Sequence, residues 1–149
     1  MSENRSEIVV WLHGDHLSVQ NPALTRYPNA PVVFVFDEPF LQEAQFAFHR
    51  LFFLYESVLD LFETRGGICS VRRGNVVQEV ASFAEEHGAT VVATTQTPGE
   101  RFASYRQELA QQFRVQALPV PLLVPYDAER VPKRFSAWWR EVENEALTP

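Results

Sequence analysis

A chain of 149 residues with 46% hydrophobic and 21% charged side chains can bury a core of ordinary size, so we expect one globular domain over residues 1–149. The net charge of −6, with no basic run longer than Arg72-Arg73, argues against autonomous nucleic-acid binding, and the single cysteine excludes an internal disulfide. No apolar run approaches the roughly 20 residues of a membrane helix, and the polar start is not a signal peptide, so we expect a cytoplasmic protein with no membrane contact.

Short apolar runs alternate with segments of helical periodicity along the chain. This alternation is typical of a parallel sheet with helices on both faces. We expect five strands, at residues 8–12, 32–36, 68–71, 90–93 and 115–118.

A polar loop follows the first predicted strand and contains His13, Gly14, Asp15 and His16. Parallel sheets bind ligands outside the carboxyl ends of their strands, so a site is expected first in this loop. Two histidines and one carboxylate without a further spaced ligand make a poor zinc signature, and no nucleophile stands at a suitable spacing for a hydrolase or transferase. We therefore predict no metal and no catalytic residue here, and we expect Asp15 to cap the following turn through backbone amides.

The longest helix is expected between the second and third strands, where apolar residues recur at spacings of three and four. Gly66-Gly67 would end it. The apolar positions are Leu41, Ala44, Phe48, Leu51, Phe52, Tyr55, Val58, Leu59 and Phe62.

Two further helices have start signals of their own. Asn75 can cap a helix that ends near His87-Gly88, and Gly74-Asn75 reads as a turn and cap rather than as an anion site. Thr97, Pro98 and Glu100 form the pattern of a capping box for the next helix.

The proline-rich residues 117–132 should run extended before a last short helix. That helix carries Phe135, Trp138, Trp139 and Val142. Because adjacent helix positions point about 100° apart, one of the two tryptophans is expected to be exposed as an interface anchor. The alternative is that both rings pack back on the sheet.

Several motifs in order carry a family resemblance. The first loop ends in Asn21-Pro22-Ala23-Leu24, residues 50–61 contain a Phe-Leu-x-Glu-Ser core, and residues 71–80 combine a strand, a glycine and a helix start. Residues 105–107 and 135–139 match more weakly. The chain thus resembles the amino-terminal α/β domain of the photolyase and cryptochrome family. The resemblance implies a three-layer, Rossmann-like (HUP-type) α/β fold with a five-stranded parallel sheet of order 3-2-1-4-5 and helices on both faces.

The chain departs from the family in two places. The usual Arg-Arg-Asp-Leu-Arg run of the first loop is replaced by residues 13–17, and Gly14 to Ser18 look like the Gly-Asp-Gln-Leu-Ser of the bacterial iron-sulfur photolyase branch. Family members continue into a helical flavin-binding domain, whereas this sequence stops at Pro149. The expectation is that the chain is not a photolyase on its own.

The resemblance also implies a site for an antenna pigment. Residues after the fourth strand contact the pigment in some relatives, and the family's asparagine and acidic residues are replaced there, which favours a deazaflavin, flavin nucleotide or lumazine over a folate. The expected cofactor-binding residues are Gly14, Asp15, His16, Thr94, Thr95 and Gln96.

The expected function is a stand-alone photolyase-like or cryptochrome-like domain in light sensing or DNA photorepair. It would bind an antenna chromophore or nucleotide, or pair with a separate flavin domain. The alternative is a ligand-free protein-interaction module on the same fold, with a homodimer through Trp138 and Trp139.

Overall fold

The computed structural model describes residues 6–148, in which five parallel strands form one sheet of order β3-β2-β1-β4-β5. The strands are β1 (Ile8–Leu12), β2 (Val32–Asp37), β3 (Cys69–Gly74), β4 (Val91–Thr95) and β5 (Arg114–Leu118). Both the predicted strand order and the parallel arrangement are confirmed.

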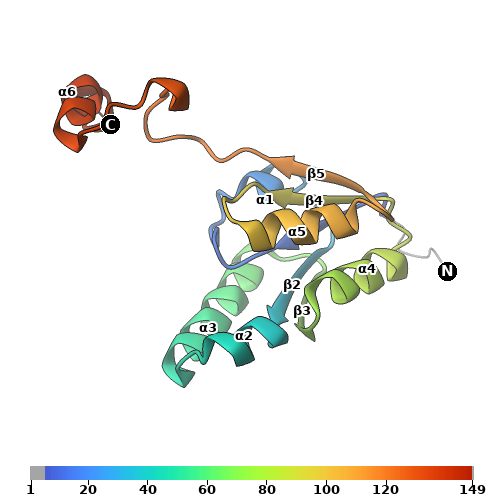
Figure 1. Ribbon diagram of the computed structural model, residues 1–149. Helices are drawn as coiled ribbons and strands as arrows, with labels where there is room; N and C mark the ends of the chain where they lie inside the picture. The colour runs from blue at the N-terminus through green and yellow to red at the C-terminus, as the bar shows by residue number, and fades with distance from the viewer. Residues whose placement is uncertain (1–5, 149) are drawn as a thin grey trace.

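Helices cover both faces of the sheet (Figure 1). They are α1 (Pro22–Arg26), α2 (Glu38–Ala44), α3 (Phe48–Arg65), α4 (Val76–Glu86), α5 (Glu100–Leu109) and α6 (Phe135–Ala146), with a 3-10 turn, η1, at Ala128–Arg130. None of the helices in the described part of the chain combines the length and the apolar character needed to cross a bilayer.

Alternation along the strands divides the buried side chains between two cores. Val9 and Trp11 of β1 face α4 and α5, whereas Val10 and Leu12 face α1 and α3. A strand that is apolar on both faces is expected in a parallel sheet covered on both sides. The predicted three-layer architecture is therefore confirmed.

The longest predicted helix is interrupted. Gln45 adopts a left-handed conformation, with φ 48°, and separates α2 from α3. The break brings the ring of Phe46 against that of Phe40, with 5.6 Å between centroids. Apolar spacing alone could not show it, because the pattern continues across Gln45 and no glycine or proline marks the place.

The predicted start of α5 is also wrong, whereas that of α4 is right. Asn75 caps α4, since its Oδ1 accepts from the backbone N–H of Gln78 at 3.1 Å. At α5 the cap position is Gly99, with φ 122°, and the Thr97 hydroxyl donates instead to Asp15 at 2.8 Å. The long-range partner thus displaces the local capping box.

The carboxyl-terminal segment lies apart from the sheet, with α6 at its end (Figure 1). Both Trp138 and Trp139 are half-buried against the ring of Phe135, and Trp138 also contacts Tyr126. Neither expectation for the pair is met, because the rings cover one another and do not pack on the sheet. The extended run is also broken, by η1.

Candidate functional site

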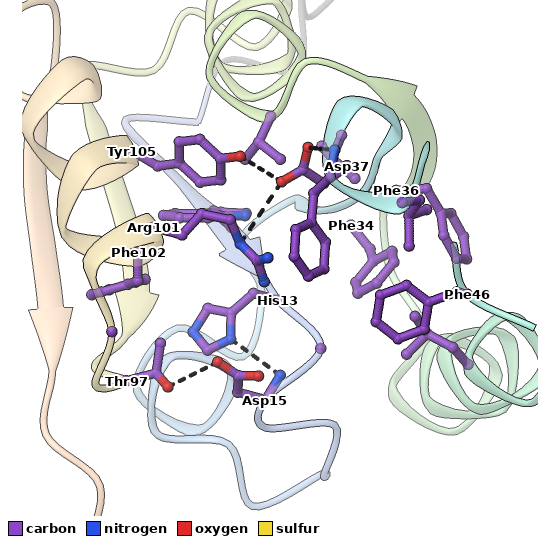
Figure 2. Close-up of a pocket in the computed structure, with 18 of the residues that line it drawn as sticks. His13, Asp15, Phe34, Phe36, Asp37, Phe46, Thr97, Arg101, Phe102 and Tyr105 are labelled. Atoms are coloured by element: carbon purple, nitrogen blue, oxygen red, sulfur yellow. Dashed lines mark hydrogen bonds and ion pairs between the residues drawn. The ribbon is translucent and has the colours of Figure 1, made fainter. Parts of the chain in front are cut away.

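A cavity of about 510 Å³ lies at the carboxyl ends of β1 and β2 (Figure 2). Its wall is formed by the loop after β1, the end of β2 with α2, the start of α3, and the segment from Thr97 to Tyr105. Sheet order 3-2-1-4-5 places the chain reversal between β1 and β4, and this is where open α/β sheets form their ligand crevice.

Aromatic rings face the cavity from two sides (Figure 2). On one side Trp11 stacks on Phe102, with 5.5 Å between centroids and 18° between planes. On the other side Phe34 meets Phe36 edge to face at 5.1 Å, and Phe46 lies beside them. Two aromatic walls suit a flat, conjugated molecule better than a compact polar one.

Asp37 closes one end of the cavity, where β2 ends. Its Oδ1 accepts from the backbone N–H of Phe40 at 3.3 Å, and its Oδ2 accepts from the Tyr105 hydroxyl at 2.5 Å. Burial, followed by the hydrogen bond to this carboxylate, raises the pKa of Tyr105 to about 12. Tyr105 is therefore a neutral donor at physiological pH, and it fixes the carboxylate in place.

Two arginines lie over phenylalanine rings in the cavity wall. The guanidinium carbon of Arg101 is 3.3 Å from the ring centroid of Phe40, and that of Arg50 is 4.6 Å from the ring centroid of Phe46. Arg101 Nε also lies 3.9 Å from Asp37 Oδ2. Stacking orients each planar group while its N–H edges stay available to an anion.

His13 is held by both ring nitrogens. Nε2–H donates to the carbonyl of Thr95 at 2.7 Å, because that oxygen can only accept, and Nδ1 accepts from the N–H of Asp15 at 3.4 Å. Burial lowers the pKa of His13, so the imidazole is neutral at pH 7. It joins the loop after β1 to the end of β4 and contributes an edge to the aromatic wall.

Only two of the six expected binding residues line the cavity, namely Gly14 and Asp15. Asp15 does not cap the following turn as predicted. Its carboxylate accepts from Thr97, which draws together the loops after β1 and β4. Asn21 has the capping role instead, since its Oδ1 accepts from the N–H groups of Ala23 and Leu24.

The other four expected residues lie outside the cavity lining. Thr94 and Thr95 are 0% and 1% exposed, and their hydroxyls donate to the carbonyl of Trp11 at 2.9 Å and to Asn21 Oδ1 at 2.7 Å. These hydroxyls join β4 to β1 and α1, so they are not available to a ligand. Gln96 accepts from Arg106 at 3.4 Å, and the carbonyl of His16 accepts from the Asn21 amide.

Sequence reasoning missed Asp37, Phe40, Arg101 and Tyr105. Asp37 had a usable signal, because it follows the apolar run of β2 at the carboxyl edge of the sheet. Arg101 and Tyr105 had none, since their partners are 64 and 68 positions away in the chain. Within residues 6–148, no three His, Cys, Asp or Glu side chains gather as possible metal ligands.

Comparison with known proteins gives a consistent result. The family model described as DNA photolyase matches residues 8–149. Among solved structures, the cryptochrome of Synechocystis sp. PCC6803 matches with a TM-score of 0.73 and 17% identity, covering 97% of this chain and 35% of that protein. A bacterial class III photolyase from Agrobacterium tumefaciens matches with a TM-score of 0.69 and 18% identity, covering 96% and 33%. The chain thus spans about a third of the length of each. No curated sequence matches significantly.

Proposed function

The chain belongs to the DNA photolyase family, and on that premise we propose that it binds an antenna-type chromophore in the cavity beside Asp37. The pigment class is a deazaflavin, a flavin nucleotide or a lumazine. The absorbed energy would pass to a flavin held by a separate helical domain, in light sensing or DNA photorepair.

The observation that carries the proposal is a cavity lined by aromatic rings together with charged side chains. A volume of about 510 Å³ is within the range of cofactor sites, and a two- or three-ring pigment bound there would lie against a lining that includes Phe102, Phe36 and Phe46. Stacking against such walls would also shift the pigment's absorption.

The polar groups of the cavity would set the orientation of the pigment. Asp37 presents a half-buried carboxylate that can accept from a ring N–H, because its contacts with Phe40 and Tyr105 hold it in place. Arg50 and Arg101 can donate to a phosphate or carboxylate on the pigment's side chain. Gly14 also lines the cavity, and a Cβ at this position would be in ordinary van der Waals contact with Leu54, at 3.7 Å.

The test is pigment uptake by the purified chain. The protein is incubated with a deazaflavin, flavin mononucleotide, a lumazine and a folate, and is then freed of excess ligand and examined by absorption and fluorescence. We expect one of the first three to be retained with a red-shifted spectrum and the folate to be washed away.

A matched pair of variants tests whether the pigment binds in this cavity. Arg101 and Arg106 are both exposed residues of α5, but only Arg101 lines this cavity. Arg101→Gln should weaken binding of an anionic pigment about 10-fold through loss of a charge-assisted hydrogen bond, whereas Arg106→Gln should change it less than about 2-fold. Equal effects would place the pigment elsewhere, and no uptake of any of the four pigments would contradict the proposal.

The alternative, a ligand-free interaction module, has an observation of its own in the exposed aromatic residues of α3. It predicts that no pigment is retained and that the cavity tolerates filling. A Leu51→Trp variant places a large ring in the cavity wall. If the cavity holds no ligand, this variant should bind any partner protein as tightly as the wild type does.

A further inference from the structure

Helix α2 forms part of the wall of the cavity beside Asp37, but it is weakly anchored to the rest of the molecule. Phe40 and Leu41 of α2 line the cavity, yet none of the seven residues of this helix is buried. By contrast, α4 buries six of its 11 residues. An element with few buried side chains opens at little free-energy cost, so α2 can move while the sheet stays folded.

The two ends of α2 allow it to turn as a unit. At its start, the carboxylate of Asp37 caps the helix where β2 ends, so a pivot here would lie at the edge of the sheet. At its other end, the left-handed conformation of Gln45 stops the helix three residues before α3 begins. The helical hydrogen bonds of α2 end at this break, so α2 is not rigidly joined to α3.

Two side-chain contacts hold α2 in its present position. Glu38 pairs with Arg73 of β3 at 2.6 Å, and the side chain of Arg73 is 75% exposed. The ring of Phe40 lies under the guanidinium of Arg101, which belongs to α5 in another wall of the cavity. An exposed ion pair and a single cation–π contact each stabilise a position only weakly in water, so both can break and form again readily.

We propose that α2 is a lid on the cavity, which swings away to admit a ligand and closes again with Phe40 and Leu41 against it. Both side chains are only half-buried in this structure, and their burial against a ligand would favour the closed lid. The contact between Arg101 and Phe40 joins the lid to α5 and acts as its latch. The lid rests on the proposed function, because the ligand on which it closes is the pigment.

Hydrogen–deuterium exchange read by mass spectrometry tests the lid directly. The protein is measured alone and with an excess of flavin mononucleotide, a deazaflavin or a lumazine. Without pigment, the amides of residues 40–47 should exchange at least about 10-fold faster than those of residues 58–65, which include the buried part of α3. A bound pigment should slow exchange in residues 40–47 at least about 10-fold and change it in residues 58–65 less than about 2-fold.

Two neighbouring arginines of β3 provide matched variants outside the cavity lining. Each forms an ion pair at 2.6 Å, Arg73 with Glu38 of α2 and Arg72 with Glu86 of α4. Arg73→Gln removes a tether of the lid, so the rate of pigment dissociation in stopped-flow fluorescence should rise about 3-fold. Arg72→Gln leaves the lid tethered and should not change that rate.

The outcomes separate the lid from the pigment site. Three results would overturn the lid alone: slow exchange of residues 40–47 without pigment, exchange that a bound pigment does not slow, or equal dissociation rates in the two arginine variants. If none of the three pigments binds, the proposed function is contradicted and the lid with it.

Discussion

Asn21 connects three parts of the molecule through one buried amide. Its Oδ1 accepts from Ala23 N–H at 2.9 Å, from Leu24 N–H at 3.2 Å and from the Thr95 hydroxyl at 2.7 Å, while its Nδ2 donates to the carbonyl of His16 at 2.9 Å. The side chain is 2% exposed. The Asn-Pro pair therefore starts α1 and also locks the end of β4 to the first loop.

We predict that Asn21→Ala lowers the free energy of unfolding by about 3 kcal/mol, since it removes a helix cap and leaves buried polar groups without partners. Asn75→Ala is the matched control. Asn75 caps α4 through one exposed contact with Gln78, so its loss should cost about 1 kcal/mol. Urea unfolding of the two variants measures the difference, and equal losses would show that the buried contacts of Asn21 add nothing.

His13 should make stability depend on pH in the acid range. Burial lowers its folded-state pKa below the ordinary value of 6.5, so the neutral form is favoured in the folded protein. As pH falls through 6.5, the unfolded chain takes up a proton before the folded one does, and the folded protein loses stability. The contribution of neutral His13 to the free energy of unfolding is therefore fully present above pH 6.5.

A His13→Gln variant keeps an N–H that can reach the carbonyl of Thr95 but cannot titrate. Its unfolding free energy should fall less than that of the wild type between pH 7 and the acid side of pH 6.5. Urea titrations at a series of pH values measure this. Identical pH profiles for the two proteins would rule out His13 as the source.

At the scale of single elements, the α2–α3 junction holds Gln45 in a left-handed backbone conformation. A residue other than glycine with φ 48° is disfavoured, and glycine is the usual residue at such a helix end. Gln45→Gly should therefore raise the free energy of unfolding by about 0.5–1 kcal/mol. Gln42→Gly, inside α2, should lower it by about 1 kcal/mol. If both changes lower the free energy of unfolding, the side-chain contacts of Gln45 stabilise the fold by more than its left-handed backbone conformation costs.

The same elements show which structural features the sequence pattern can predict. The strands and the Asn75 cap were predicted because short apolar runs and capping residues are encoded within a few residues. The Gln45 break and the Gly99 start of α5 were not, since the first is a backbone conformation without a residue signal and the second follows from a Thr97–Asp15 bond across 82 positions. Of the six expected site residues, Gly14 and Asp15 border the cavity, whereas the hydroxyls of Thr94 and Thr95 are occupied by partners that only the fold reveals.

At the scale of the whole molecule, the sheet and the carboxyl-terminal segment should differ in protease resistance. Arg130, Lys133 and Arg134 are exposed and lie in the connection to α6. We predict that trypsin cuts here first and leaves a resistant fragment that contains all five strands. Mass spectrometry of the time course identifies the cuts. Earlier cleavage at Arg101 or Arg114 would contradict the prediction.

The three tryptophans lie in two separate parts of the molecule, so their fluorescence can report on each part. Trp11 stacks on Phe102 in the cavity wall, whereas Trp138 and Trp139 lie on α6. A Trp138→Phe, Trp139→Phe chain would emit from Trp11 alone, and its quenching by energy transfer to a bound pigment would count occupied cavities directly. A Trp11→Phe chain would emit only from α6, and the wavelength of its emission would follow the exposure of that helix to water. The protein thus contains one fluorescent reporter for the cavity and another for α6.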